Sequence, residues 1–396
     1  MPELKRALSL GKSSSPGPDK IPPDFFRNLK PDQLNTFLGI LNYFWNSGLP
    51  DSWKSSIVIP IMKHGKPPNS TSSYRPISLT NSSCKILERM ISFRLKLHLE
   101  QNSLTNKFQS GFRSRFSTTD NIVRLENSIR LNTLKSKATL TVFLDLNQAF
   151  DSVHHDSLLN KIASLGITGN LACFIKDFLS NRSIRVRYNG TFSNSFSVPV
   201  GVPQGSVISP TLFTMMIDDI FNDCPDDICY SLYADDLAIW TSCVNLNLCM
   251  SKIQSAIDML CNWGNIWGLS FAPNKTKAIF FTRRRIPQSL LKLNGSDIEF
   301  VTPFKFLGVV FDKSLTWKPH ILNIKAKCEK DLRIMRITSH NSWGADFSTL
   351  KMLYTAYILP KINYCSFIYN SCCQVKSANS RSYSICCCPN YAWCPN

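Results

Sequence analysis

Acidic residues are scarce in this sequence. Its 396 residues contain 27 Asp and Glu against 45 Lys and Arg, which gives a formal net charge of +18 at pH 7. A positive excess of this size is typical of proteins that bind polyanions such as nucleic acids. The alternative is that the basic charge only keeps the protein in solution. The charge therefore favours a nucleic-acid partner without identifying a reaction.

Long apolar runs are also missing. The opening stretch, MPELKRALSL, lacks the apolar segment of a signal peptide. An uncharged stretch runs from Tyr188 to Ile217, but Pro199, Pro203 and Pro210 exclude a membrane-spanning helix there. We therefore expect an intracellular protein with no membrane partner, in which thiols stay reduced.

Paired cysteines with zinc-binding spacing are absent as well. Eight of the 15 Cys lie before Lys330 in contexts typical of a core, and seven follow Tyr364. The segment that contains most of these seven ends in ICCCPNYAWCPN, with no His and no CxxC pair. This composition argues against a zinc site. We interpret the tail, residues 371–396, as a truncated or wrongly read terminus.

The apolar pattern predicts an α+β chain with one mixed or antiparallel sheet and a helical part after about Lys318. Helical spacing marks LNTFLGILNYFWNS, with a stop at Gly48, and CKILERMISFRLKLHL. Ser117 and Asp120 resemble a capping box at the start of another helix. Strands are predicted for SSIVIPI, YRPISL, ATLTVFLD, KAIFF and FKFLGVVFD, and a hairpin for SLYADDLAIW.

Two adjacent carboxylates, Asp235 and Asp236, lie at the apex of this predicted hairpin. They form either a solvated turn or, if held away from water, a site that requires a cation. A third carboxylate, Asp145, ends the buried strand ATLTVFLD, where an unpaired charge is costly. Taken alone it is also consistent with a strand-end cap or an ion pair. Together the three could form a two-metal site for phosphoryl transfer.

A third stretch, GVPQGSVISPTLF, places Gly201 and Gly205 around Pro203 and Gln204, just before a predicted helix. A bare-backbone turn of this kind lets a flat ligand approach the main chain, with the Gln204 amide beside it. The alternative is an ordinary Gly/Pro loop.

In this order, FLDLNQAFDSV, GVPQGSVISPTLF and YADDLAIW resemble the palm motifs of reverse transcriptases. SSSPGPDKIP, SSYRPISLTNSSCKILERMI, FQSGFRSRFSTTDNI, GLSFAPNKTKAIFF and FKFLGVVFDKSLTW are similar to further blocks of non-LTR, LINE-like retrotransposons of the jockey type. The resemblance covers roughly residues 10 to 370. It implies a right-hand polymerase fold with fingers, a palm with an antiparallel sheet, and a helical thumb.

By this resemblance Asp145, Asp235 and Asp236 are catalytic and hold two Mg²⁺ ions, for which Mn²⁺ could substitute. The implied deoxynucleotide-binding residues are Lys63, Arg75, Phe150, Gln204, Gly205 and Lys275, with Lys277 close enough to compete for the last role. The implied partners are an RNA template, a DNA primer and deoxynucleoside triphosphates, with the nucleus as the place of action. The oligomeric state is left open.

The resemblance also divides the chain. We expect a lead-in loop and helix (1–48), fingers and a passage to the palm (49–137), a palm with a return to the fingers before residue 200 (138–313), a thumb (314–370) and the tail (371–396). We find neither an endonuclease before this region nor an RNase H pattern, which suggests an excised or decayed piece of a mobile element. The rival to an active polymerase is a catalytically silent nucleic-acid-binding relic.

Overall fold

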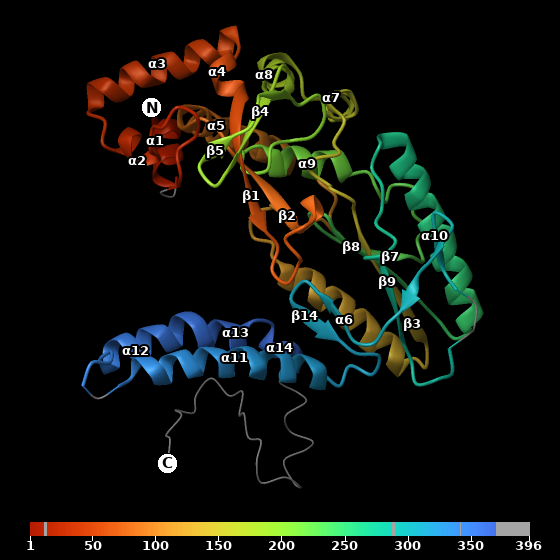
Figure 1. The fold of residues 1–396 in the computed structure, drawn as a ribbon. Coiled ribbons are helices and arrows are strands. Elements are labelled where there is room, and N and C mark those ends of the chain that lie inside the picture. The colour runs from red at the N-terminus through yellow and green to blue at the C-terminus, as the bar shows by residue number, and fades with distance from the viewer. Residues whose placement is uncertain (12–13, 287–289, 341, 370–396) are drawn as a thin grey trace.

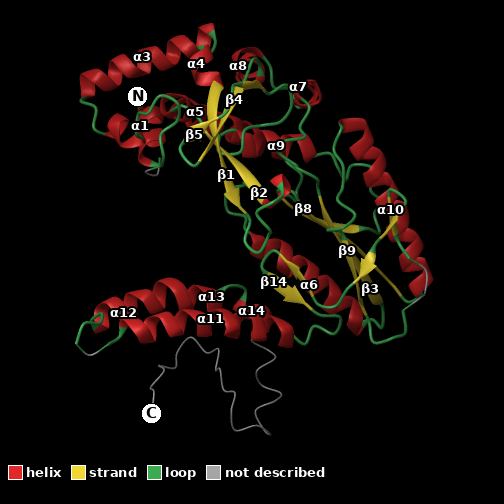
Figure 2. Cartoon of the chain, in the orientation of Figure 1, coloured by secondary structure: helices red, strands yellow, loops and turns green. Residues whose placement is uncertain are grey.

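Two five-stranded sheets, flanked by helices, organise the chain (Figure 1, Figure 2). The computed structural model describes residues 1–11, 14–286, 290–340 and 342–369. The tail predicted for residues 371–396 lies outside the described residues. No helix among those described is both long enough and apolar enough to cross a membrane.

The N-terminal sheet has the strand order β2-β1-β4-β5, with β6 also paired to β4. Strand β1 runs antiparallel to β2 and parallel to β4. The strands are β1 (Ser55–Met62), β2 (Tyr74–Leu79), β4 (Ser183–Tyr188), β5 (Thr191–Phe192) and β6 (Phe196–Ser197). The helices of this part are α1 (Pro2–Ser9), α2 (Pro23–Arg27), α3 (Pro31–Ser47), α4 (Asp51–Lys54), η1 (Thr71–Ser73), α5 (Ser82–Gln101), α7 (His155–Ser164), α8 (Gly169–Leu179) and α9 (Ser209–Ile217).

The central sheet has the strand order β12-β9-β3-β8-β7. Its middle strand β3 is antiparallel to both neighbours, and only the short edge strand β12 runs parallel to its partner β9. The strands are β3 (Ala138–Asp145), β7 (Cys229–Tyr233), β8 (Asp236–Cys243), β9 (Lys277–Phe281) and β12 (Glu299–Phe300).

Apolar side chains cover both faces of the central sheet. On one face Leu140 and Val142 join the core that includes α10 (Leu246–Trp267). On the other, Phe143 and Trp240 pack with α6 (Thr118–Leu134) and with the hairpin of β13 (Phe304–Phe306) and β14 (Val309–Phe311). Because both faces are covered, every residue of β3 before Asp145 is buried. The strand therefore ends with a carboxylate, Asp145, at the edge of the core.

The C-terminal helices extend from the β13–β14 hairpin, away from α10 (Figure 1). They are α11 (Lys318–Thr338), α12 (Phe347–Leu353), η2 (Tyr354–Ile358), α13 (Leu359–Asn363) and α14 (Ser366–Tyr369). The short strands are β10 (Lys292–Leu293), β11 (Ser296–Asp297), β13 (Phe304–Phe306) and β14 (Val309–Phe311). Tyr364 ties these helices to the hairpin and to α6, since its hydroxyl donates to the Leu307 carbonyl at 2.6 Å and lies 2.8 Å from Thr118 Oγ1.

Most predicted elements are present, and the α+β class is confirmed. Helix α3 ends at Ser47 and is followed by the predicted stop, Gly48, with φ +95°, and the Ser117–Asp120 capping box forms. The expectation of a single sheet is wrong, because β1 pairs with β4 more than a hundred residues later to build a separate sheet. FKFLGVVFD is also not one strand. Its Leu307 and Gly308 adopt positive φ and turn the chain into the β13–β14 hairpin.

We expect Leu140→Ala to destabilise the protein by about 2–5 kcal/mol, because it empties a fully buried position in the middle strand. Leu134→Ala is the matched control: this leucine ends α6 with 83% of its surface exposed, and we expect a change within about 0.5 kcal/mol. Denaturant unfolding measures both. Equal losses would contradict the placement of β3 in the core.

Candidate active site

The register of the central sheet brings the predicted carboxylates together. Asp145, the last residue of β3, stands directly opposite Asp236, the first residue of β8. Tyr233 pairs with Asp236, so Ala234 and Asp235 alone form the turn of the predicted hairpin. Side chains of directly opposed residues project from the same face of a sheet, with Cβ atoms about 4.5–5.5 Å apart. The fold thus places two carboxylates side by side and a third next to them.

Such a cluster is electrostatically unfavourable by itself, because like charges directly opposite each other repel. Reduced hydration and repulsion by Asp235 and Asp145 raise the pKa of Asp236 to about 6. Burial and the Asp145 charge also raise the pKa of Asp235, although Lys275 and Arg75 act in the opposite direction. Protonation, or a cation, relieves this repulsion.

The structure distinguishes the two candidate lysines. The pairing of β3 with β9 places Lys277 opposite Phe143, and Lys275 lies two residues earlier, toward Asp145. Lys275 Nζ donates to Asp145 Oδ2 at 2.5 Å. Lys277 instead pairs with Glu299 on β12 at 2.7 Å. The lysine that contacts the carboxylate cluster is therefore Lys275.

The donor set fits a hard divalent cation, since carboxylate oxygens are the ligands that Mg²⁺ and Mn²⁺ prefer. In the described ranges, however, no three or more His, Cys, Asp or Glu side chains are already gathered around one metal position. The positive charge at Asp145 comes from Lys275. A pocket opens beside these groups and is lined by Asp145, Asp236, Lys275 and residues 304–307 of the β13–β14 hairpin.

The Gly/Pro loop before α9 requires its glycines. Gly201 has φ +93° and a Cβ there would lie 2.8 Å from the Asp151 carbonyl oxygen. At Gly205, φ is +128° and a Cβ would lie 2.4 Å from the Ser78 carbonyl oxygen. The Gln204 amide between them donates to both carboxylate oxygens of Asp151, at 3.0 and 2.9 Å. This loop therefore joins β2 to the turn after β3.

The remaining predicted residues lie around that turn. Phe150 stacks on Phe213 of α9, with ring centroids 4.6 Å apart, and stays partly exposed. Lys63 follows β1, and Arg75 is an exposed residue of β2. Burial raises the pKa of Asp151, and the Gln204 amide and the Lys63 charge oppose that shift. The Lys63 charge thus lowers the pKa of Asp151, in the turn that carries Phe150, while the Arg75 charge lowers the pKa of Asp235.

Glu88 is a site residue that the sequence patterns did not single out. This fully buried carboxylate of α5 accepts hydrogen bonds from Ser206 and from the backbone N–H groups of Val207, at 2.7 Å, and Ile208, at 3.2 Å. It therefore fixes the loop just after Gln204 and Gly205. The detectable signal was an acidic residue within the buried stripe that α5 forms with Cys84, Ile91 and Leu95.

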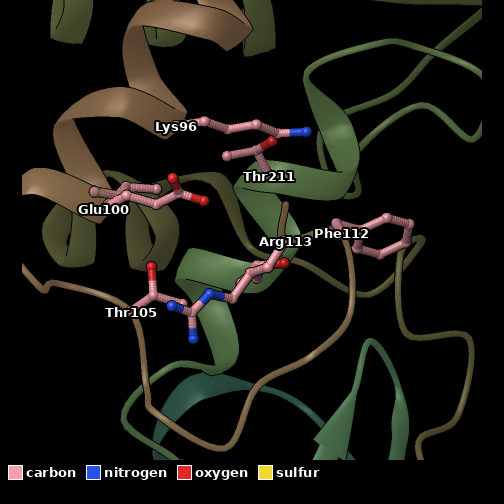
Figure 3. A pocket seen from close by; sticks show the side chains of 8 residues that line it. Lys96, Glu100, Thr105, Phe112, Arg113 and Thr211 are labelled. Carbon is pink, nitrogen blue, oxygen red and sulfur yellow. The ribbon is translucent and has the colours of Figure 1, made fainter. Parts of the chain in front are cut away.

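A second, smaller pocket contains none of the predicted residues. Its lining includes Lys96 and Glu100 of α5, Thr211 of α9, and Phe112 and Arg113 of the loop between α5 and α6 (Figure 3). Arg113 Nη1 donates to two backbone carbonyls of its own loop, at 3.0 and 3.2 Å. The guanidinium therefore stabilises the shape of that loop.

Comparison with known proteins gives the family of the chain. Residues 61–311 match the family model described as reverse transcriptase (RNA-dependent DNA polymerase). The chain belongs to this family. It is 34% identical over 336 residues to the RNA-directed DNA polymerase from mobile element jockey of Drosophila melanogaster. The aligned region covers 82% of this chain and 36% of that protein. Its counterpart in Drosophila funebris is 30% identical and covers 93% of this chain and 41% of that protein.

The resemblance to jockey-type reverse transcriptases, and with it the right-hand polymerase fold, is therefore confirmed. The chain spans about two fifths of the length of these relatives or slightly less. Among solved structures, apo telomerase from Candida tropicalis truncated from its C-terminal domain gives a TM-score of 0.46 at 14% identity, over 71% of this chain and 58% of that one. The boundaries expected for fingers, palm and thumb stay a prediction.

The raised carboxylate pKa values predict a pH-dependent stability. Between about pH 4 and pH 6 these two carboxyl groups bind more protons in the folded protein than in the unfolded chain, so their contribution to stability falls as pH rises through this range. We expect Asp236→Asn to raise the Tm at pH 7 by roughly 1–3 °C, a small gain because solvent screens this exposed side chain. The gain should shrink toward pH 4.

Asp297→Asn, at an exposed position of the β10–β11 hairpin, is the control and should not alter the pH dependence. Thermal melts at pH 4 and pH 7 measure both variants. A gain for Asp236→Asn that is the same at both pH values would contradict mutual repulsion as its cause.

Proposed function

We propose that this chain is an RNA-directed DNA polymerase domain that extends a primer 3′-hydroxyl on an RNA template, in retrotransposition. The observation that carries the proposal is the cross-strand pair of Asp145 and Asp236, with Asp235 in the adjoining turn and Lys275 against Asp145. Three carboxylates at one end of a buried sheet, with raised pKa values at two of them, are suited to holding cations rather than to building a core. The family of the chain agrees with that use.

In this proposal Asp145 and Asp235 hold two Mg²⁺ ions, with Asp236 in support. Ions bound there would supply activation of the attacking oxygen and stabilisation of the leaving pyrophosphate. Lys63 and Arg75 bind the triphosphate, a task suited to a point charge and to a bidentate fork. The positive net charge of the chain serves the phosphates of template and primer.

The other residues orient the nucleotide. Phe150 lies in the turn that follows Asp145, where its ring can contact the sugar of a nucleotide whose phosphates lie at the metal ion that Asp145 would hold. Gln204 and Gly205 offer an amide and bare backbone to the nucleotide and template. Glu88 holds this loop in place. We place this activity in the nucleus, where a retrotransposon meets its target DNA.

The rival function is a catalytically silent nucleic-acid-binding relic of a mobile element. Net charge supports both functions equally. The lysine against Asp145 and the buried carboxylate behind the Gln204 loop favour the enzyme, because a binding relic requires neither.

Asp235→Asn should reduce primer extension on an RNA template by at least about a hundredfold, while template affinity changes less than about threefold. A neutral amide is a poor ligand for Mg²⁺, whereas template binding rests on many Lys and Arg contacts to phosphate. Gel-based primer extension and fluorescence anisotropy measure the two properties. Asp297→Asn serves as the control and should leave both at parent levels. A variant that extends primers at the parent rate would refute the site, and a parent that binds RNA without extending primers would favour the relic.

Phe150→Val should raise the ratio of kcat/KM for a ribonucleotide to that for its deoxynucleotide by about tenfold or more. Attraction discriminates poorly against one added hydroxyl, so rejection of ribonucleotides needs a steric obstacle, and valine is a smaller one. The stack with Phe213 also makes Phe150 part of the core, so stability should fall. A loss that affects both substrates alike, with an unchanged ratio, would leave Phe150 only its packing role.

A further inference from the structure

The segment 108–111 runs along the outer strand of the β7–β8 hairpin. Gln109 forms a parallel bridge with Leu232 of β7. The Leu232 N–H donates to the Phe108 carbonyl at 3.2 Å, and the Leu232 carbonyl accepts from the Ser110 N–H at 3.0 Å. Asn121 Nδ2 of α6 donates to the same carbonyl at 2.8 Å. The segment therefore extends the central sheet by one short partner, next to the turn that carries Asp235.

Gln109 reaches from this segment into the turn itself. Its side chain is fully buried, and its Oε1 accepts hydrogen bonds from the Ala234 N–H at 3.2 Å and from the Gly111 N–H at 2.7 Å. One oxygen thus joins the backbone of the segment to the first residue of the turn. Buried N–H groups that lose their acceptor are costly, so this oxygen is energetically significant.

The turn needs such a restraint because its conformation is strained. Ala234 has φ +55°, in the left-handed region that residues with a Cβ rarely adopt. The backbone of Gly111 lies so close that a Cβ there would be 2.3 Å from the Ala234 nitrogen. Contact and hydrogen bond together hold Ala234 in place, and Asp235 follows directly in the chain.

We propose that Gln109 is a positioning residue that fixes the Ala234–Asp235 turn, and through it the carboxylates of Asp235 and Asp236. Its effect on catalysis rests on the proposed polymerase function, whereas its effect on the turn does not. A displacement of about 1 Å at reacting groups can cost a hundredfold in rate, while substrates keep their many other contacts. Loss of the oxygen should therefore lower kcat and leave KM nearly unchanged.

Gln109→Met tests this, since methionine has a similar size and no oxygen. We expect the amide of Ala234 to exchange with deuterium about tenfold faster, as follows from one lost buried hydrogen bond. We also expect kcat for primer extension to fall by about 10–100-fold, with KM for deoxynucleotides within about threefold. Exchange is resolved to single residues by fragmentation mass spectrometry or NMR. If this variant does not fold, Gln109→Asn, which withdraws the same amide by one methylene, replaces it.

Thr241→Val is the matched control. Thr241 is buried in β8 of the same hairpin, and its hydroxyl donates to the Asp227 carbonyl at 3.0 Å, away from the turn. Its loss removes a comparable hydrogen bond, and should leave exchange at Ala234 and kcat near parent values. A kcat loss as large as that of Gln109→Met would reduce Gln109 to a general contribution to stability and overturn the proposal.

Gln109→Glu is the rescue variant, because an oxygen remains at the same position in either protonation state. It should restore slow exchange at Ala234 and recover most of kcat relative to Gln109→Met. A glutamate variant as impaired as the methionine variant, or unchanged exchange at Ala234 in Gln109→Met, would overturn the proposal. If the parent protein extends no primer, the proposed function fails, but exchange still decides whether Gln109 restrains the turn.

Discussion

Asp145 and Asp236 stand opposite each other at the end of the central sheet, where their negative charges repel. Neither carboxylate can avoid the other, because the strands β3 and β8 are paired along their whole length and packed on both faces. Positive charges from other parts of the site reduce this repulsion. Lys275 supplies a positive charge directly to Asp145, and Arg75 contributes one from the N-terminal sheet. In the proposed function, a site built in this way attracts cations before any substrate arrives, which is the property that phosphoryl transfer requires.

The geometry of the site depends on buried polar groups that lie one layer behind it. Glu88 holds the Gln204 loop through a hydroxyl and two backbone N–H groups, and Gln109 holds the Ala234–Asp235 turn through the N–H of Ala234. Both side chains belong to segments that precede β3 in the sequence, yet each acts on a loop more than a hundred residues later. The first 137 residues thus set the shape of the two loops at the carboxylate end of the sheet.

What the sequence could predict follows from the range of each signal. Asp145 and the 235–236 pair were detectable because a buried strand or a hairpin that ends in acid is a local pattern. The choice between Lys275 and Lys277 was not, because it depends on the register of β9 against β3. The second sheet was missed for the same reason, since the pairing of β1 with β4 leaves no local trace. Glu88 was locally detectable as a charged residue in an apolar stripe. The stripe alone, however, does not indicate which loop this carboxylate binds.

The arrangement is costly to fold. Gln109 Nε2 is buried without a hydrogen-bond partner among the described residues, Ala234 is strained, and two aspartates have raised pKa values. The apolar packing on both faces of the central sheet supplies favourable free energy that offsets these unfavourable terms. This explains why Asp145 and Asp236 lie at the paired ends of β3 and β8 and not in a surface loop. A flexible support would let the aspartates separate, which would relieve their repulsion and remove the field that makes them useful.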